Sequence, residues 1–469
     1  MRQPRRRPRR RARHWGLALA VSSVLTACAI APPPDRAELT RQALAQTELP
    51  AAWKFATTPG EFDAATLGFD LAPDLLALIR EAQANNPDLR VAATRIDQSR
   101  SAVKAAGASL APYLGIGGQA GDSAIPSSSM AMNGLALIVN WEIDVWGKTR
   151  SAQAASREQS LAVELDAIYA RQSIAAAVVK GWLAATEAER QLALAQEAVM
   201  LSEKQLALVE IGQKVGRDTR QDIATARVAA RNSRNQLLQS EQAVNAAKRS
   251  LEILVGRYPA AEIAVASALP EQITPLPGGL PSDLAERRPD LQAAESRFRA
   301  AFHNVEAAQK AKLPTISLVA GVGHLNNNLL VLQEDLKNPV WGITGTFLAP
   351  LFNNGALDAQ IEIKTAQQQE ATVLYAKTML NALNEIEGGL HADRLLTDRH
   401  RLLSAQLADQ QAVVELQRVQ LKVGKGSQYQ LQQQQLSLVA SRMNLLRLQN
   451  ERLIQRVNLH LALGGIYKT

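Results

Sequence analysis

Residues 147–214 read GKTRSAQAASREQSLAVELDAIYARQSIAAAVVKGWLAATEAERQLALAQEAVMLSEKQLALVEIGQK, a stretch of 68 residues without proline. Residues 355–422 form a second proline-free stretch of the same length. Because proline is the residue that most reliably breaks a helix, each stretch predicts one continuous helix. Such a helix would reach about 100 Å at 1.5 Å per residue, roughly three times the diameter of a small domain. We therefore expect long parallel rods and no compact globular core.

The two long helices belong to an internal duplication. Pro87-Asp88-Leu89 matches Pro289-Asp290-Leu291 at an offset of 202 residues. Val215-Gly216 matches Val423-Gly424 at an offset of 208 residues, so the second half carries a short insertion before Gly355. A repeat this long predicts that each half is a complete structural unit, packed beside its twin.

Both halves are expected to run in the order helix, β-hairpin, long helix, short turn, returning helix. In the first repeat, residues 75–256, Pro87 to Ala111 predicts the opening helix, since proline suits a first turn and Pro112 ends it. The remaining predicted bounds are a hairpin at about 113–146 and a returning helix at 222–256. The second repeat, residues 289–469, has its hairpin at about 315–352 and its returning helix at 428–464. Apolar and small residues spaced by three and four along both returning helices are typical of a coiled-coil seam.

A period of two marks the strands. In the first hairpin one face carries Leu135, Leu137, Val139, Trp141, Ile143 and Val145. The opposite face includes Asn140, Glu142 and Asp144. Alternation of this kind predicts a strand with one apolar and one mostly polar face. The second hairpin repeats the apolar face with Ile316, Leu318, Ala320 and Val322.

Three segments lie outside the repeats. Residues 1–27 hold eight arginines and a short apolar run, typical of an export signal and too short to span a membrane. They lead into Leu25-Thr26-Ala27-Cys28, which resembles the lipobox of bacterial lipoproteins and implies a lipid on Cys28. Residues 28–74 are expected to form an extended periplasmic arm behind this anchor. Residues 257–288 contain five prolines and predict an extended connector around mid-height.

Charge and motifs argue against nucleic-acid binding and catalysis. The formal charge of +8 comes from the eight arginines of residues 1–27, and the rest of the chain is neutral, without a basic stripe. Gly147-Lys148-Thr149 resembles the end of a P-loop, but Glu142 stands where the leading glycine belongs. The histidines are scattered, and Cys28, the only cysteine, allows no internal disulfide. We therefore expect no enzyme, no metal site and no cofactor other than the lipid, with transport energy supplied by a partner.

The strand lengths suggest a membrane pore. Strands of about ten residues can cross a bilayer when tilted, but four strands do not close a barrel, and an open edge in lipid leaves backbone groups unpaired. Three copies would supply twelve strands, enough for a water-filled lumen. The apolar faces would then meet lipid, and Asn140, Glu142 and Asp144 would face the lumen. Two soluble hairpins packed on the helices remain the alternative.

The duplicated unit, the paired Pro-Asp-Leu openings, the Val-Gly turns and the lipobox together resemble the TolC-like outer-membrane efflux factors, in their lipoprotein branch. The resemblance implies a mainly α-helical fold with a transmembrane β-barrel part: a trimer whose twelve-stranded barrel in the outer membrane continues as a twelve-helix periplasmic tunnel. It implies a passive exit duct for drugs or other small molecules, docked to a periplasmic adaptor and an inner-membrane pump of the RND type.

The resemblance also assigns functional residues to the two turns between long and returning helices. It places adaptor contact at the periplasmic tip, on Val215, Gly216, Arg217, Asp218, Val423, Gly424 and Lys425. Relatives commonly carry aspartates around the closed entrance just beyond the second turn, where this sequence has Gln430 and Gln433; only the first repeat keeps an acid, Asp222. We therefore hypothesise a gate held by amide hydrogen bonds together with Asp222.

Two other functions stay open. The outer-membrane duct of a type I protein-secretion exporter would share this architecture, although the lipobox favours drug efflux. A periplasmic coiled-coil lipoprotein without a pore belongs to a different class.

Glycines at the middle of the long helices, Gly181 and Gly388-Gly389, permit either bending or close packing against a neighbouring helix.

Overall fold

The computed structural model of the 469-residue chain describes residues 32–45, 47, 50–55, 63, 65, 67–119, 132–274, 277, 279, 281–327 and 340–467. The predicted signal segment and the lipidation site Cys28 lie outside the described residues. The chain divides into two compact units. Unit 1 comprises Met1–Ala43, Lys104–Ser156 and Phe298–Thr372, and unit 2 comprises Leu44–Val103, Arg157–Arg297 and Val373–Thr469. Each unit combines segments of both sequence repeats, so a single repeat is not a compact unit by itself.

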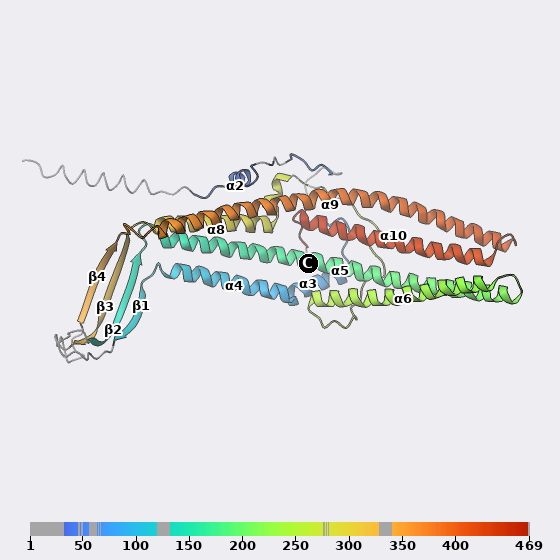
Figure 1. Ribbon diagram of the computed structural model, residues 1–469, viewed down its shortest axis with the longest axis horizontal. Helices are drawn as coiled ribbons and strands as arrows, with labels where there is room; N and C mark the ends of the chain where they lie inside the picture. Colours follow the sequence, from blue (N-terminus) through green and yellow to red (C-terminus); the bar gives the residue numbers. More distant parts are fainter. Residues whose placement is uncertain are drawn as a thin grey trace, which may run out of the picture. The chain divides into compact units, whose positions relative to one another are not determined.

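Unit 1 contains an antiparallel sheet of four strands in the order β1-β2-β3-β4 (Figure 1). The strands are β1 (Tyr113–Gln119), β2 (Met132–Ile143), β3 (Thr315–Asn327) and β4 (Val340–Leu348). The central pair, β2 with β3, joins the hairpin of one repeat to that of the other over the full length of β2. This pairing explains why the repeats do not separate into two units.

The strand register sorts the side chains of the sheet onto two faces. Directly opposed residues lie on the same face of a sheet, and neighbouring rows alternate between faces. One face carries rows such as Ile116, Leu137, Val322 and Trp341. The other carries the rows Tyr113, Asn140, Val319, Thr344 and Glu142, Ser317, Thr346, together with several glycines. The sheet therefore has one mainly apolar face, as the alternation predicts, and one face that combines polar residues and glycines with a few apolar side chains such as Ile138 and Val319.

Helices make up most of the rest of the described chain (Figure 1). The long helices are α5 (Lys148–Lys214) and α9 (Ala356–Lys422), and the returning helices are α6 (Arg220–Val255) and α10 (Gln428–Ala462). The opening helices are α4 (Pro87–Ala108) and α8 (Pro289–Lys310). Within the described ranges, no helix has both the length and the apolar composition that a membrane-spanning helix requires.

The structure contains helical segments in three places where the sequence predicted none, two of them outside the repeats and one at the start of the first repeat. The arm contains helix α2 (Arg36–Ala43), and a further helix, α3 (Pro73–Asn85), precedes α4. The connector ends in a short 3₁₀ turn, η1 (Pro281–Asp283), and one helical turn, α7 (Leu284–Arg287). Two of these segments, α3 and η1, begin with a proline, which also suits the first turn of a helix.

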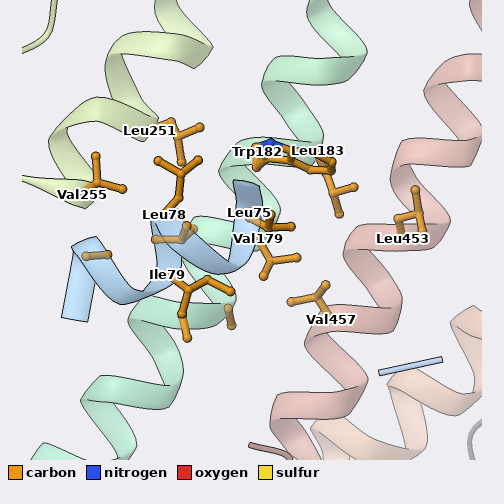
Figure 2. Packing of buried hydrophobic residues seen from close by; sticks show 14 of the residues in the cluster. Leu75, Leu78, Ile79, Val179, Trp182, Leu183, Leu251, Val255, Leu453 and Val457 are labelled. Carbon is orange, nitrogen blue, oxygen red and sulfur yellow. The ribbon is translucent and has the colours of Figure 1, made fainter. Parts of the chain in front are cut away.

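The main hydrophobic core of unit 2 surrounds helix α3 (Figure 2). It brings together Leu75, Leu78 and Ile79 of α3, Val179, Trp182 and Leu183 of α5, Leu251 and Val255 of α6, and Leu453 and Val457 of α10. Each fully buried side chain of this kind contributes about 1.5–3 kcal/mol relative to its exposed state. The small helix that the periodicity analysis missed therefore lies at the centre of this core.

The duplication is visible in equivalent joints at the start of the opening helices. Before α4, Asn86 Nδ2 donates to the carbonyl of Leu254 at 2.8 Å. Before α8, Arg288 Nη1 donates to the carbonyl of Ala462 at 3.1 Å. The donors lie 202 positions apart and the acceptors 208, which are the two offsets of the sequence repeat. Both joints tie an opening helix to the end of the returning helix in its own repeat.

Glu252 ties the connector to the end of α6. Its side chain is buried, and its carboxylate accepts hydrogen bonds from the backbone NH groups of Ala261, Glu262 and Ile263 at 2.7, 2.7 and 3.0 Å. Burial on its own would raise the pKa of Glu252, but these three bonds outweigh it and hold the pKa below its ordinary value.

We expect Glu252→Gln to lower the free energy of unfolding by about 2 kcal/mol at neutral pH, because hydrogen bonds to a charged acceptor are lost. A depressed folded-state pKa stabilises the fold above the unfolded value, about 4.3 for glutamate, and this stability is lost as the pH falls through the folded pKa. The difference between the two proteins should therefore shrink in acid. Denaturant unfolding followed by circular dichroism measures it, and a difference that stays constant with pH would contradict the role of the carboxylate.

Candidate functional site

The candidate site consists of the two turns that join long to returning helices in unit 2. In each turn, a glycine with positive φ ends the long helix: Gly216 at +74° and Gly424 at +73°. Two backbone bonds close each end, from Arg217 N to Gly212 O and from Gly216 N to Gln213 O in the first turn. The second turn repeats them with donors Lys425 and Gly424 and acceptors Gln420 and Leu421. This is the Schellman arrangement, which satisfies carbonyls that a helix end otherwise leaves free.

Glycine is required at positions 216 and 424 because the backbone has a positive φ there, and not because a side chain would lack room. A Cβ atom at Gly216 or Gly424 would meet nothing within 4 Å. We expect Gly216→Ala to lower the free energy of unfolding by about 1–2 kcal/mol, because alanine is strained at positive φ. Gly181→Ala is the matched control. There φ is helical and a Cβ would make ordinary contact with Leu251, so alanine should be neutral or stabilising by up to about 1 kcal/mol. Thermal unfolding compares the two, and equal losses would contradict this explanation.

Each returning helix begins with a capping box. Thr219 Oγ1 accepts from the NH of Asp222 at 3.2 Å, and the Asp222 carboxylate accepts from the NH of Thr219 at 2.8 Å. Ser427 and Gln430 form the same reciprocal pair at the start of α10. Positions 222 and 430 differ by the repeat offset. Two of the three predicted gate residues therefore have a local task, which is to satisfy free NH groups at a helix start.

The predicted gate residues differ in what remains available to a partner. Asp222 is exposed, and its hydrogen bonds from the Thr219 side chain and backbone lower its pKa, so it is ionised at neutral pH. The side-chain oxygen of Gln430 accepts a hydrogen bond from the backbone NH of Ser427 at 3.4 Å, which is long for such a bond. Gln433 is exposed one turn further along α10. A different pair of glutamines crosses between helices, since Gln410 Nε2 of α9 donates to Gln434 Oε1 of α10 at 3.0 Å.

A pocket of about 460 Å³ lies between the two turns. It is lined by Leu208, Val209, Arg217, Asp218, Leu421, Gly426, Ser427, Gln428 and Tyr429. The structure thus brings together two of the predicted contact residues, Arg217 and Asp218, whose charged groups lie 3.9 Å apart. The other predicted side chains, Val215, Val423 and Lys425, are exposed on the turns. Tyr429 was not predicted as a site residue. The sequence signal that could have indicated it is its position, two residues after the capping residue Ser427.

The predicted lumen residues lie in unit 1. Asn140 and Glu142 are exposed and share the polar face of the sheet, with Glu142 paired to Lys148 Nζ at 2.5 Å. Asp144 does not extend this face, because strand β2 ends at Ile143. Its carboxylate instead accepts from the NH groups of Thr149 and Arg150 at 3.1 and 3.0 Å, at the start of α5. Asp144 therefore caps a helix.

The glycines at the middle of the long helices have different surroundings. A Cβ at Gly389 would lie 3.1 Å from Leu459 Cδ1, so this glycine allows α9 to approach α10 closely. Gly388 faces a cavity of about 440 Å³ bordered by Tyr169, Glu385 and Asn458. No cluster of three or more metal-ligating side chains occurs among the residues that the structure describes.

The comparison with known proteins decides the family. A family model described as "Outer membrane efflux protein" matches residues 78–257 and 280–465, well over half of the chain. The chain belongs to this family. Its members are outer membrane channels and not enzymes, and the chain is accordingly an outer membrane efflux channel that extends into the periplasm.

Individual relatives agree with the family match. The cation efflux system protein CusC of Escherichia coli O6:H1 is 28% identical over 394 residues, which cover 83% of this chain and 85% of CusC. The toluene efflux pump outer membrane protein TtgC of Pseudomonas putida is 29% identical over 416 residues, covering 84% of this chain and 83% of TtgC. The open-state crystal structure of the Neisseria gonorrhoeae MtrE outer membrane channel superposes with a TM-score of 0.80 at 24% identity, covering 90% of this chain and 96% of MtrE. The outer membrane efflux fold, with its β-barrel and helical tunnel, is therefore the fold of this chain.

Proposed function

We propose that this channel is the exit duct of a tripartite efflux system for drugs or other small molecules. In this proposal three copies form the duct, which docks to a periplasmic adaptor and, through it, works with an inner-membrane pump of the RND type. The duct itself is passive, has no catalytic activity, and carries no cofactor other than a covalent lipid on Cys28. Two alternatives would replace this proposal if it fails: the duct of a type I protein-secretion exporter and a periplasmic lipoprotein without a pore.

The four-stranded sheet is the observation that carries the proposal. Among the residues that the structure describes, strands β1 and β4 each have a partner strand on one side only. Backbone groups at an open edge would be left unpaired in lipid at a cost of several kcal/mol each, so the edges require further strands. Three copies give twelve strands, which supports a barrel with an open lumen. The polar, glycine-containing face then suits the lumen and the apolar face suits lipid.

The relatives support small molecules over proteins as the cargo. The name of CusC refers to cation efflux and that of TtgC to toluene efflux, and both cargoes are small. Each relative covers more than four fifths of this chain, so the likeness spans the whole duct and is not confined to one segment. We infer small-molecule export here from the same architecture.

The pocket between the turns supports adaptor docking. It combines the exposed Arg217 and the partly buried Asp218, a pair of opposite charges, with the apolar side chains Leu208, Val209 and Leu421 and the half-exposed ring of Tyr429. Exposed valines, Val215 and Val423, flank it on the two turns. An apolar centre beside charged groups is the usual composition of a protein-binding surface.

The proposed function is tested with the purified full-length protein in planar lipid bilayers and by electron microscopy in detergent. We expect stepwise ion conductance and hollow particles with three-fold symmetry. A monomeric, non-conducting protein would favour the pore-less lipoprotein. Deletion of the gene then separates the two ducts: increased drug sensitivity supports efflux, and loss of a secreted protein supports the secretion exporter.

The lipid anchor is tested separately, since Cys28 lies outside the described residues. Metabolic labelling with a radioactive fatty acid should label the native protein and not Cys28→Ser. If both proteins take up label, or neither does, the lipid on Cys28 is wrong, and the duct proposal is unaffected.

Asp222 is expected to make the conductance sensitive to divalent cations. Its carboxylate is exposed and ionised at neutral pH, and in a trimer three copies would lie near the entrance. Single-channel recordings should show weaker block by divalent cations in Asp222→Ala than in the native channel. Gln430→Ala removes the equivalent capping side chain without a charge and should leave the block unchanged. Identical block in native protein and Asp222→Ala would remove Asp222 from the gate.

A further inference from the structure

The turn between strand β4 and helix α9 contains the sequence Asn353-Asn354-Gly355. Asn354 has a φ of +55° and Gly355 a φ of +80°, and both residues are exposed. We propose that Asn354 is a site of spontaneous deamidation, where the side-chain amide is converted into a carboxylate without an enzyme. This inference concerns a modification site and does not rest on the proposed function.

The two reacting groups are not engaged elsewhere in the part of the chain that the structure describes. They are the side-chain carbon Cγ of Asn354 and the backbone nitrogen of Gly355. The Asn354 amide makes no hydrogen bond there, and the NH of Gly355 donates to no described acceptor. A Cβ atom built on Gly355 would meet nothing within 4 Å, so neither a side chain nor a neighbouring segment shields the nitrogen. Water can reach both groups.

The reaction follows from this arrangement in two steps. After a base removes its proton, the Gly355 nitrogen attacks Cγ of Asn354, forming a new C–N bond. Nδ2 takes up a proton from water or the protonated base as its bond to Cγ breaks, and it leaves as ammonia, which gives a five-membered cyclic imide. Water then adds to one of the two imide carbonyls and opens the ring. The product is aspartate when the original peptide link is restored, and isoaspartate when the main chain runs through the side-chain carbon. Glycine favours the first step because it has no side chain that obstructs the approach.

The chain contains an internal control. Its second Asn-Gly pair, Asn133-Gly134, lies in strand β2. There Asn133 is opposite Asn326, and Gly134 is opposite Gln119 on one side and Leu325 on the other. A backbone held between two neighbouring strands is not free to bend towards its own side chain. The same dipeptide should therefore react at position 354 and stay intact at position 133 while the protein is folded.

The new carboxylate would lie at a favourable position. Helix α9 begins at Ala356, and negative charge is stabilised near the N-terminus of a helix. The long helix of the first repeat already has such a group, since the Asp144 carboxylate accepts from two NH groups at the start of α5. Deamidation would add a second acidic group to the start of α9, whose first turn already holds Asp358. We therefore expect the modified protein to remain folded.

The test is peptide mapping by mass spectrometry of the full-length protein after incubation in mildly alkaline buffer. We expect aspartate and isoaspartate to accumulate at position 354, with isotope uptake from labelled water, while Asn133 keeps its amide. Hydroxylamine, which cleaves the cyclic imide, should cut the folded chain after residue 354. In denaturant both pairs should convert. Loss of amide at both sites in the folded protein, or conversion of Asn133 only, would overturn the inference.

Asn354→Gln provides the unreactive variant, because its longer side chain would have to form a less favourable six-membered ring. It should resist both conversion and hydroxylamine cleavage. Circular dichroism confirms that this variant is folded, so a negative result reports on chemistry. If Asn354 itself stays intact in folded protein while it converts in denaturant, the turn protects the residue and the inference is wrong.

Discussion

Arg288→Ala is expected to lower the free energy of unfolding by about 3 kcal/mol, because removing one partner of a buried ion pair typically costs about 3–5 kcal/mol. The Arg288 side chain is almost fully buried, and it holds two carboxylates. Its Nε and Nη2 donate to Asp290 at 3.0 and 2.8 Å, and its Nη1 donates to Glu385 at 2.7 Å. Since the Glu385 side chain is half exposed, water compensates part of the loss, and the value should lie at the lower end of that range.

The electrostatics of Arg288 support this expectation. Burial would lower the pKa of its guanidinium, but the hydrogen bonds and charges of Asp290 and Glu385 more than compensate and raise it. The group is therefore charged at any pH at which the protein is folded, and its loss leaves Asp290 and Glu385 without a counter-charge in the structure described.

The equivalent joint in the first repeat is the matched control. Asn86 is also buried and accepts hydrogen bonds from the NH groups of Asp88 and Leu89 at the start of α4, but it carries no charge. Asn86→Ala should cost about 1 kcal/mol, as the loss of a helix cap does. Arg288→Lys should fall between the two, because lysine keeps the charge without the forked geometry. Denaturant unfolding measures all three variants, and similar losses for Arg288→Ala and Asn86→Ala would show that the charge contributes nothing.

The long helices could be predicted because their ends have strong local signals. Both stretches contain no proline, and each is followed two residues later by a glycine, Gly216 or Gly424. The structure has helices α5 and α9 ending at Lys214 and Lys422, the last residues of the two stretches. Backbone conformation at a C-terminal glycine depends on that residue itself, so the sequence is sufficient to locate it.

Helix α3 shows why a short element escapes such reasoning. It has thirteen residues and begins at Pro73, between a proline-containing arm and a longer helix with a clear start. Its buried residues, Leu75, Leu78, Ile79 and Ala82, do follow helical spacing. The pattern covers only two turns, however, and an isolated helix of this length is marginal in water. It forms because α5, α6 and α10 bury its apolar face, which a single-sequence pattern does not reveal.

Only part of the candidate site could be predicted from the sequence. Thr219 followed by Asp222, and Ser427 followed by Gln430, match the spacing of a capping box, so the local role of two gate residues could have been inferred. The pocket between the turns could not, because it forms where α5 and α9, far apart in sequence, both end. The hydrogen bonds from the connector to Glu252 could not be predicted either, because the connector has no hydrophobic periodicity.

Leu137→Arg is expected to prevent accumulation of the assembled channel in the outer membrane. Leu137 lies on the apolar face of the sheet, in a row with Ile116, Val322 and Trp341. An arginine that faces lipid near the middle of a transmembrane barrel costs about 2–4 kcal/mol per chain, and in a trimer the cost is paid three times. The measurement is the amount of this protein in outer-membrane fractions. Detecting it before and after the sample is heated distinguishes assembled from unassembled chains.

Asn140→Arg is the control that makes this result specific to the face of the sheet. Position 140 lies three residues further along the same strand, and its row, with Tyr113, Val319 and Thr344, belongs to the polar face. Arginine there should be tolerated, and it should change ion selectivity in planar bilayers because it would add a charge to the proposed lumen. The opposite outcome, with Leu137→Arg assembling normally and Asn140→Arg failing, would mean that the polar face meets lipid. Failure of both variants would mean that neither face lines water, and the assignment of the lumen to Asn140 and Glu142 would have to be abandoned.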